Sequence, residues 1–88
     1  MPRFEYKYKD NYRITFEAES NGSETLELNG QEISSGLSPL WPGDHSATVL
    51  LDGAWVTIKL VGRTIKKNPR TYQWTLTLNG EEKTKWTW

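Results

Sequence analysis

Apolar and polar residues alternate with a period of two along most of this 88-residue sequence. The alternating runs are rich in β-branched and aromatic residues, and Gly, Asn, Asp and Pro interrupt them, which is typical of short antiparallel strands. No stretch shows the 3.6-residue period of a helix. We therefore expect an all-β protein of about seven to nine short strands joined mostly by hairpins, packed as an antiparallel two-layer β-sandwich or a partly open barrel. Residues 1–88 are expected to form one domain.

Side-chain parity predicts the loop length of each hairpin, because a one-residue shift in register moves every apolar residue to the other face. In the first hairpin, Tyr8 and Tyr12 share a face only if the loop is odd. We expect a three-residue loop at 9–11, with Asn11 in the left-handed conformation. In the second hairpin, Leu28 and Ile33 require an even loop, and Asn29-Gly30 predicts a two-residue type I′ turn.

The third hairpin is predicted to close through a two-residue turn at Asp52-Gly53. This register places Leu51 opposite Ala54 on the core face. On the other face it places Leu50 opposite Trp55, so these two residues are expected to form an outward pair.

The last hairpin contains Asn79-Gly80 within a segment, 76–82, that resembles residues 26–32. One seven-residue repeat does not establish a duplication, because any hairpin-rich sequence reuses such turns. An odd loop of three or five residues would bury Trp86 and Trp88 beside Trp74, whereas a two-residue turn would point them the other way. We expect the odd loop, because burying a tryptophan contributes a few kcal/mol.

Residues 34–43 form the longest predicted connection and contain two prolines and two glycines. Leu40 and Trp41 lie within it. One interpretation is that this apolar loop and the outward Trp55 form a contact surface. The alternative is that the loop covers the sheet and both tryptophans are internal.

The charges are unevenly distributed, although the net charge is zero. Residues 1–52 carry nine acids and four bases, and residues 53–88 carry two acids and seven bases. Acidic and basic strands are expected to pair across the sheets, and the alternative is a basic face for an anionic partner. Four cations, Arg63, Lys66, Lys67 and Arg70, lie within eight residues. We expect them to form a solvated hairpin loop. The alternative is a patch that binds nucleic-acid phosphates, and the zero net charge counts against it.

The sequence lacks the residue patterns of an enzyme or a metal site. There is no cysteine, and His45 is the only histidine. Asp44, His45 and Ser46 are neighbours in sequence, and such neighbours rarely align as a catalytic set, so we expect His45 to be a polar loop residue before the strand at Ala47. The acidic residues that remain as possible ligands are expected to be solvated and outward-facing: Glu17, Glu19, Glu24 and Glu27. We predict no enzyme activity, no cofactor and no metal.

The sequence also predicts the compartment. No apolar run approaches the roughly 18 residues that span a bilayer, and the segment MPRFEYKYKD has no apolar core of the signal-peptide type. The absence of cysteine fits a reducing compartment. We expect a soluble, cytoplasmic protein without a membrane partner.

Four segments resemble the Fas apoptotic inhibitory molecule family. They are Arg13-Ile14-Thr15-Phe16-Glu17, Leu28-Asn29-Gly30-Gln31-Glu32-Ile33, Ile58-Lys59-Leu60-Val61-Gly62 and Tyr72-Gln73-Trp74-Thr75-Leu76-Thr77-Leu78-Asn79-Gly80. They span most of the chain, and each is a strand-and-turn pattern rather than a catalytic signature. The resemblance implies a β-sandwich and a non-enzymatic, protein-binding function, and it transfers no site residue. The family places two such domains in one polypeptide, whereas this sequence holds one.

These observations predict a non-enzymatic module that binds a protein or peptide. The alternatives are a domain that binds a carbohydrate or small ligand through exposed tryptophans, and an accessory subunit of an enzyme complex. The residues predicted to contact the partner are Leu40, Trp41, Leu50 and Trp55.

Overall fold

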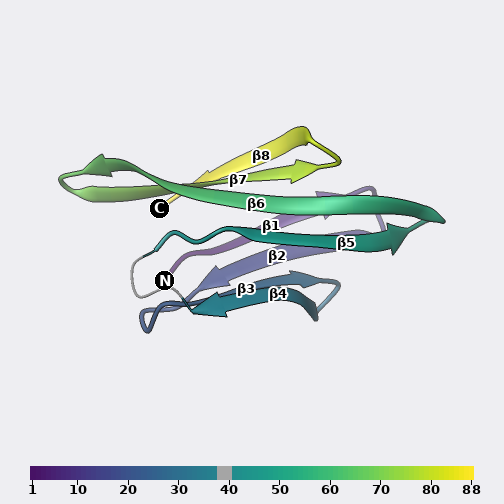
Figure 1. Ribbon diagram of the computed structural model, residues 1–88, viewed down its shortest axis with the longest axis horizontal. Helices are drawn as coiled ribbons and strands as arrows, with labels where there is room; N and C mark the ends of the chain where they lie inside the picture. Colours follow the sequence, from purple (N-terminus) through teal and green to yellow (C-terminus); the bar gives the residue numbers. More distant parts are fainter. Residues whose placement is uncertain (38–40) are drawn as a thin grey trace.

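The computed structural model describes residues 1–37 and 41–88, and within them it contains eight strands and no helix (Figure 1). The strands are β1 (Arg3–Tyr8), β2 (Tyr12–Ala18), β3 (Ser23–Leu28), β4 (Gln31–Leu37), β5 (His45–Leu51), β6 (Ala54–Lys67), β7 (Arg70–Leu78) and β8 (Glu81–Thr87). They form two four-stranded antiparallel sheets, sheet A in the order β1-β2-β3-β4 and sheet B in the order β5-β6-β7-β8. The predicted all-β, two-layer fold is confirmed. None of the described residues forms a helix that could cross a membrane.

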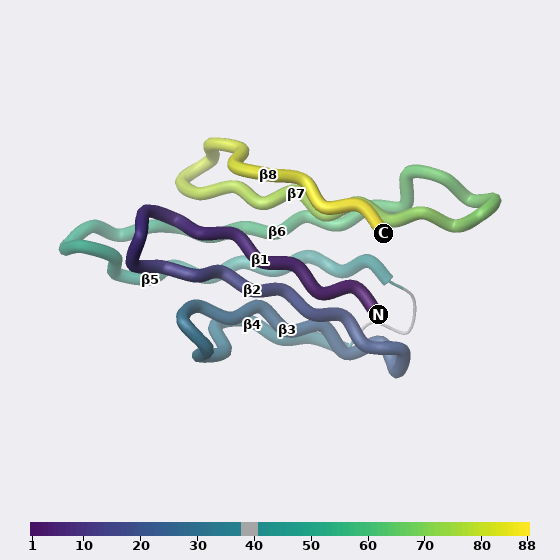
Figure 2. Tube along the Cα trace, turned by 180° about the vertical axis from the view of Figure 1, so that it is seen from behind, coloured from purple at the N-terminus to yellow at the C-terminus, as the bar shows by residue number. Residues whose placement is uncertain are grey.

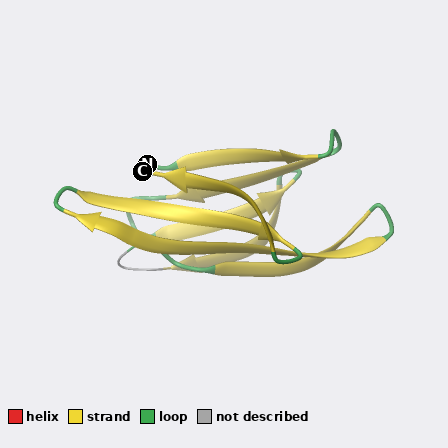
Figure 3. Ribbon diagram, turned by 90° about the horizontal axis from the view of Figure 1, so that it is seen from above, coloured by secondary structure: helices red, strands yellow, loops and turns green. Residues whose placement is uncertain are grey.

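The hydrophobic core lies between the two sheets. Phe16 and Leu26 from sheet A and Leu60 and Trp74 from sheet B are completely buried there. Figure 3 shows that strands, drawn in yellow, make up most of the described chain. Each sheet is a meander in which every strand pairs with its sequence neighbour. Residues far apart in sequence therefore meet mainly through contacts between the sheets.

Strand β6 determines the elongated shape. Its 14 residues rise about 3.3 Å each, or about 46 Å in total, which matches the 44 Å long dimension of the molecule. Because β6 is longer than its neighbours, the β5–β6 turn projects at one end of the molecule and the β6–β7 hairpin at the other (Figures 1 and 2).

Three of the four predicted loop lengths are confirmed. Tyr8 pairs with Tyr12 across three residues, and two-residue turns join Leu28 to Gln31 and Leu51 to Ala54. The first loop differs from the prediction in one detail, because Lys9, rather than Asn11, has a positive φ of 53°.

The odd loop predicted for the last hairpin is wrong. Asn79-Gly80 forms a two-residue turn, and both residues have the positive φ that a type I′ turn requires. A β-bulge after Leu76 then leaves Lys83 unpaired, so that Trp86 still lies opposite Trp74. Trp86 is partly buried, but Trp88 is 50% exposed, so the expectation that Trp88 belongs to the core is also wrong.

A matching bulge in β3–β4 leaves Ile33 unpaired and puts Ser34 opposite Leu26. Strand β4 also continues to Leu37, so the predicted connection at 34–43 is shorter than expected.

The two Asn-Gly turns are held in the same way in both sheets. The Asn29 side chain accepts a hydrogen bond from the Arg13 N–H and donates one to the Asn11 carbonyl, at 2.8 and 3.1 Å. Asn79 bonds Thr57 and Trp55 in the same pattern, at 2.8 and 3.4 Å. The resemblance between residues 26–32 and 76–82 therefore extends to a bulge and an asparagine network that join three strands.

The uneven charge distribution separates the two sheets. Residues 1–37, which form sheet A, carry seven acids and four bases, and residues 41–88, which form sheet B, carry four acids and seven bases. In the described residues, the strands of sheet A do not pair with those of sheet B. The expectation that acidic and basic strands pair as neighbours is therefore wrong. Of the ion pairs in the described residues, those of Lys9 with Asp52 and His45 with Glu24 join the two sheets.

An exposed cluster joins the sheets at the β5–β6 end. The Tyr12 hydroxyl donates to Asp52 Oδ1 at 2.8 Å and accepts from the Asp52 N–H at 3.1 Å, while Lys9 Nζ lies 3.3 Å from Asp52 Oδ2. The hydrogen bonds from Tyr12 and from Lys9 lower the pKa of Asp52, and the bond to Asp52 raises the pKa of Tyr12. Both shifts mean that the folded protein prefers a charged Asp52 and a neutral Tyr12.

Replacing Tyr12 with Phe should make the protein less sensitive to acid. Because the pKa of Asp52 is lowered on folding, its contribution to stability is present above the unfolded pKa and is lost as the pH falls through the folded pKa. We expect Tyr12→Phe to lower the thermal midpoint at pH 7 and to differ less from the wild type at about pH 2, where only the hydrogen bond from the Asp52 N–H is still lost. Asp52→Asn is a second test, since Asn suits the positive φ of this turn position. A difference between Tyr12→Phe and wild type that is the same at both pH values would contradict the role of Asp52.

Candidate functional site

The predicted outward pair is present on sheet B. Leu50 lies opposite Trp55 in the β5–β6 register, and the two residues are 56% and 68% exposed, respectively. The next pair on this face is Thr48 and Thr57, whose hydroxyl oxygens are 3.0 Å apart. An exposed apolar pair therefore lies beside a pair of uncharged threonines at one end of sheet B.

The backbone beneath Trp55 is held in place by the Asn79 side chain. Asn79 Nδ2 donates to the Trp55 carbonyl, and Asn79 Oδ1 accepts from the Thr57 N–H. On the other face of the same strand, Val56 is buried in the core. These bonds hold the backbone that carries the indole ring, and no hydrogen bond in the described residues involves the Trp55 side chain itself.

The outer faces of the two sheets differ in charge. Along β1 and β2 the outward residues are mostly charged, as in the pairs Arg3–Glu17 and Lys7–Arg13. On sheet B, the outward positions near the centre carry fewer charges, since Thr77 faces Lys59 and Thr75 faces Val61 across β6 and β7. Apolar contact with a partner costs less desolvation at the Leu50–Trp55 end than on the charged face of sheet A.

The structure does not bring all four predicted contact residues together. Leu50 and Trp55 are adjacent, but Trp41 is partly buried and packs edge-to-face against Tyr72 and Trp88, with ring centroids 5.7 and 5.8 Å apart. Tyr72 pairs with Thr64, nine residues along β6 from Trp55, which is about 30 Å. Leu40 lies outside the described residues.

A buried polar chain that sequence reasoning missed connects the two sheets. His45 Nδ1 is 3.0 Å from Ser34 Oγ, and His45 Nε2 is 2.9 Å from Glu24 Oε1. Glu24 Oε2 also accepts a hydrogen bond from the Gly43 N–H at 2.9 Å. Glu24 is 1% and His45 6% exposed. The expectations that Glu24 faces solvent and that His45 is a loop residue are therefore wrong, since His45 begins β5 and bonds to β3 and β4.

The order of hydroxyl, imidazole and carboxylate in this chain is also that of hydrolytic enzymes. A nucleophile needs an open space for the substrate carbonyl. The nearest hollow, about 180 Å³ in volume, is lined by Glu24, Gly36, Leu37, Gly43, Asp44 and His45, and Ser34 is not among these residues. We assign this hydrogen-bonded row of side chains a structural role, because each of its polar groups has a partner in another strand or in the adjoining loop.

One signal in the sequence points to Glu24. It has the same parity as Leu26 and Leu28, so an alternating strand would place it on the core face. A carboxylate in that position requires a buried partner, and His45 is the only histidine available. Nothing in the sequence points to Ser34, because its inward direction depends on the bulge at Ile33.

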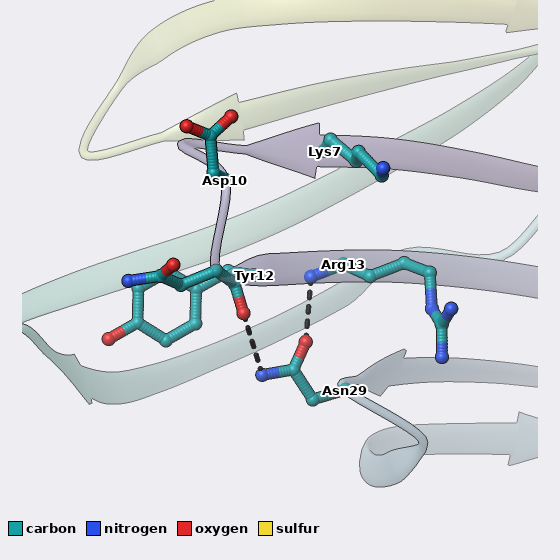
Figure 4. A pocket seen from close by; sticks show the side chains of 6 residues that line it. Lys7, Asp10, Tyr12, Arg13 and Asn29 are labelled. Atoms are coloured by element: carbon teal, nitrogen blue, oxygen red, sulfur yellow. Dashed lines mark hydrogen bonds between the residues drawn. The ribbon is translucent and has the colours of Figure 1, made fainter.

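A second hollow, of about 320 Å³, lies beside the first hairpin (Figure 4). Its lining residues are Lys7, Asp10, Asn11, Tyr12, Arg13 and Asn29. The dashed bonds in Figure 4 belong to the asparagine network that sheet B repeats, so they maintain the fold rather than form a ligand site. Lys7 and Arg13 are exposed and are directly opposed across β1 and β2.

Among the described residues, no three side chains of the His, Cys, Asp or Glu type are grouped so that they could hold a metal ion. Comparison with protein-family models, with curated proteins and with solved structures gives no match for this chain. The functional proposal therefore rests on the residues themselves.

Proposed function

We propose that the protein is a non-enzymatic module that binds a protein or peptide through Leu50 and Trp55. The observation that carries the proposal is the exposure of these two residues, 56% and 68%, as neighbours on a rigid sheet. Tryptophan is enriched among the residues that dominate binding energy at protein interfaces. An exposed aromatic residue beside an aliphatic one supplies contact area with little loss of side-chain entropy on binding.

The proposal is of the same class as the protein-binding function that the resemblance to the Fas apoptotic inhibitory molecule family implies. The proposal includes a cytoplasmic location, which the absence of cysteine favours. An exposed indole also suits stacking on a sugar ring, so binding of a carbohydrate is the second candidate.

Trp55→Ala should weaken peptide binding strongly without unfolding the protein. We would select a displayed random-peptide library on the wild type and measure the selected peptides by fluorescence anisotropy. A central tryptophan contributes about 2 kcal/mol or more, so we expect Kd to rise about 30-fold or more in Trp55→Ala. The thermal midpoint should change little, because the side chain is mostly exposed.

Trp88→Ala is the matched control, since it removes a second exposed tryptophan near the opposite end of the molecule. It should leave peptide binding unchanged. Selected peptides that bind Trp55→Ala as tightly as wild type would refute the proposed surface. A glycan panel, read by tryptophan fluorescence, tests the second candidate, and Trp55-dependent saturation with a glycan alone would favour the carbohydrate function over the peptide function.

A further inference from the structure

The β6–β7 hairpin forms an arm that extends beyond the rest of the protein. Strand β5 pairs with β6 only as far as Leu60, and β8 reaches β7 only as far as Tyr72, so residues 65–70 pair within the β6–β7 hairpin alone and no third strand lies beside them. All residues from 63 to 70 are exposed. The arm is visible as the green hairpin at the left of Figure 1 and at the right of Figure 2. We call residues 63–71 the basic arm.

The basic arm carries positive charge that nothing nearby neutralises. Its four cations are Arg63, Lys66, Lys67 and Arg70, and it contains no acidic residue. None of the ion pairs in the described part of the chain includes any of the four. The protein is neutral only because sheet A has an excess of acidic residues. Net charge therefore underestimates the attraction of this end of the molecule for an anion.

The tip of the basic arm combines these cations with apolar groups. Lys67 pairs with Arg70 across the two-residue connection Asn68-Pro69, and Pro69 is exposed. A bulge between Thr64 and Lys66 leaves Ile65 unpaired and 48% exposed. The ribbon thus ends in a proline between two cations, with an isoleucine further back.

We propose that the basic arm binds double-stranded DNA by entering a groove. Paired strands can enter the major or the minor groove, and the minor groove suits this arm, because proteins that bind there insert apolar wedges such as proline or isoleucine between base steps. The four cations contact phosphates on both sides of the groove, and Pro69 is the wedge. RNA duplexes fit less well, because their minor groove is wide and shallow. The peptide surface proposed at Leu50 and Trp55 is at the opposite end, so this site is separate from it.

The number of phosphate contacts can be measured from the salt dependence of binding. We would titrate a fluorescein-labelled 20-base-pair duplex with the protein between 25 and 150 mM NaCl and follow anisotropy. Four contacts predict a slope of log K against log[salt] of about −3.6, and Lys67→Gln or Arg70→Gln should each reduce its magnitude by about 0.9. Each variant should also weaken binding about 10-fold at 50 mM salt. The thermal midpoints should not change, because both side chains are exposed.

Two controls separate the basic arm from overall charge. Lys7→Gln and Arg13→Gln remove the same charge from exposed positions on the outer face of sheet A, and they should leave the slope and the affinity unchanged. Pro69→Ala keeps every charge, so it should preserve the slope. Wedges of this kind bend DNA by about 20–90°. Pro69→Ala should therefore remove the bend, which energy transfer between dyes on the two duplex ends measures.

Four results would overturn the proposal. They are the absence of saturable duplex binding at 25 mM salt, an equal loss of affinity in the sheet A controls, tighter binding of a single-stranded oligonucleotide of the same length, and competition by polyglutamate as effective as by unlabelled duplex. The last result would identify an acidic protein segment as the ligand of the basic arm. None of these results depends on Trp55, so the two proposals fail independently.

Discussion

Replacing Glu24 with Leu is expected to destabilise the protein by about 3–5 kcal/mol, the loss typical of removing one member of a buried hydrogen-bonded pair. The Glu24 carboxylate accepts hydrogen bonds from the Gly43 N–H and pairs with His45 Nε2, and Leu can replace neither. The buried His45 Nε2 and the half-buried Gly43 N–H would both lose their partner, and an unsatisfied buried group costs about 1–3 kcal/mol. A protein of this length has a total stability of roughly 4–13 kcal/mol, at about 0.05–0.15 kcal/mol per residue.

Urea denaturation followed by circular dichroism measures this loss, and two further variants identify its cause. Glu24→Gln keeps the size of the side chain and one acceptor oxygen, so we expect a smaller loss than for Leu. The double variant Glu24→Leu/His45→Leu removes both partners together, and it should be more stable than the sum of the two single changes predicts. If Glu24→Leu lies within about 1 kcal/mol of the wild type, the buried chain does not join the sheets.

Gly62→Ala should destabilise the protein by about 2–3 kcal/mol, since overpacked sites lose roughly 1–3 kcal/mol and this one leaves no room. A Cβ at position 62 would lie 2.4 Å from Pro42 Cβ and 2.9 Å from both the Gly43 carbonyl oxygen and Trp74 Cδ1. The proline ring and the backbone cannot rotate away as a flexible side chain would. The Gly62 N–H also donates to Asp44 Oδ1 at 3.0 Å, which holds the chain of residues 42–44 against β6.

Gly36→Ala is the matched control for this change. Gly36 also lies in a strand, but no described atom lies within 4 Å of the place that an alanine methyl group would take there, and we expect the stability of this variant to equal that of the wild type. Thermal and urea midpoints of the two variants give the comparison. Equal stability of Gly62→Ala and Gly36→Ala would mean that residues 42–43 do not pack against β6.

The hairpins show how far side-chain parity can predict this fold. Parity and turn residues predicted the loops at 9–11, Asn29-Gly30 and Asp52-Gly53, because those loops depend on a few neighbouring residues. They failed at Asn79-Gly80, where the bulge at Lys83 restores the parity that an odd loop would have supplied. A bulge adds one residue to a strand without any residue type that marks it.

The candidate sites depended on the tertiary structure to different degrees. The outward direction of Leu50 and Trp55 follows from one turn, and it was predictable. The partnership of His45 with Glu24 joins residues 21 positions apart, and the inward turn of Ser34 requires a bulge. The cations of the basic arm were visible in the sequence, but their projection depends on where β5 and β8 end.

The sequence by itself determined the all-β class, the positions of the turns and the outward pair on the third hairpin. These features arise from the period-two alternation and from residues that accept a positive φ, both of which act over a few residues. Only the tertiary structure decided the buried chain between the sheets, the separation of acidic and basic residues, and the extension of the basic arm. These depend on which strand edges meet and where pairing stops, and such contacts form between segments whose separation along the chain leaves no local signal.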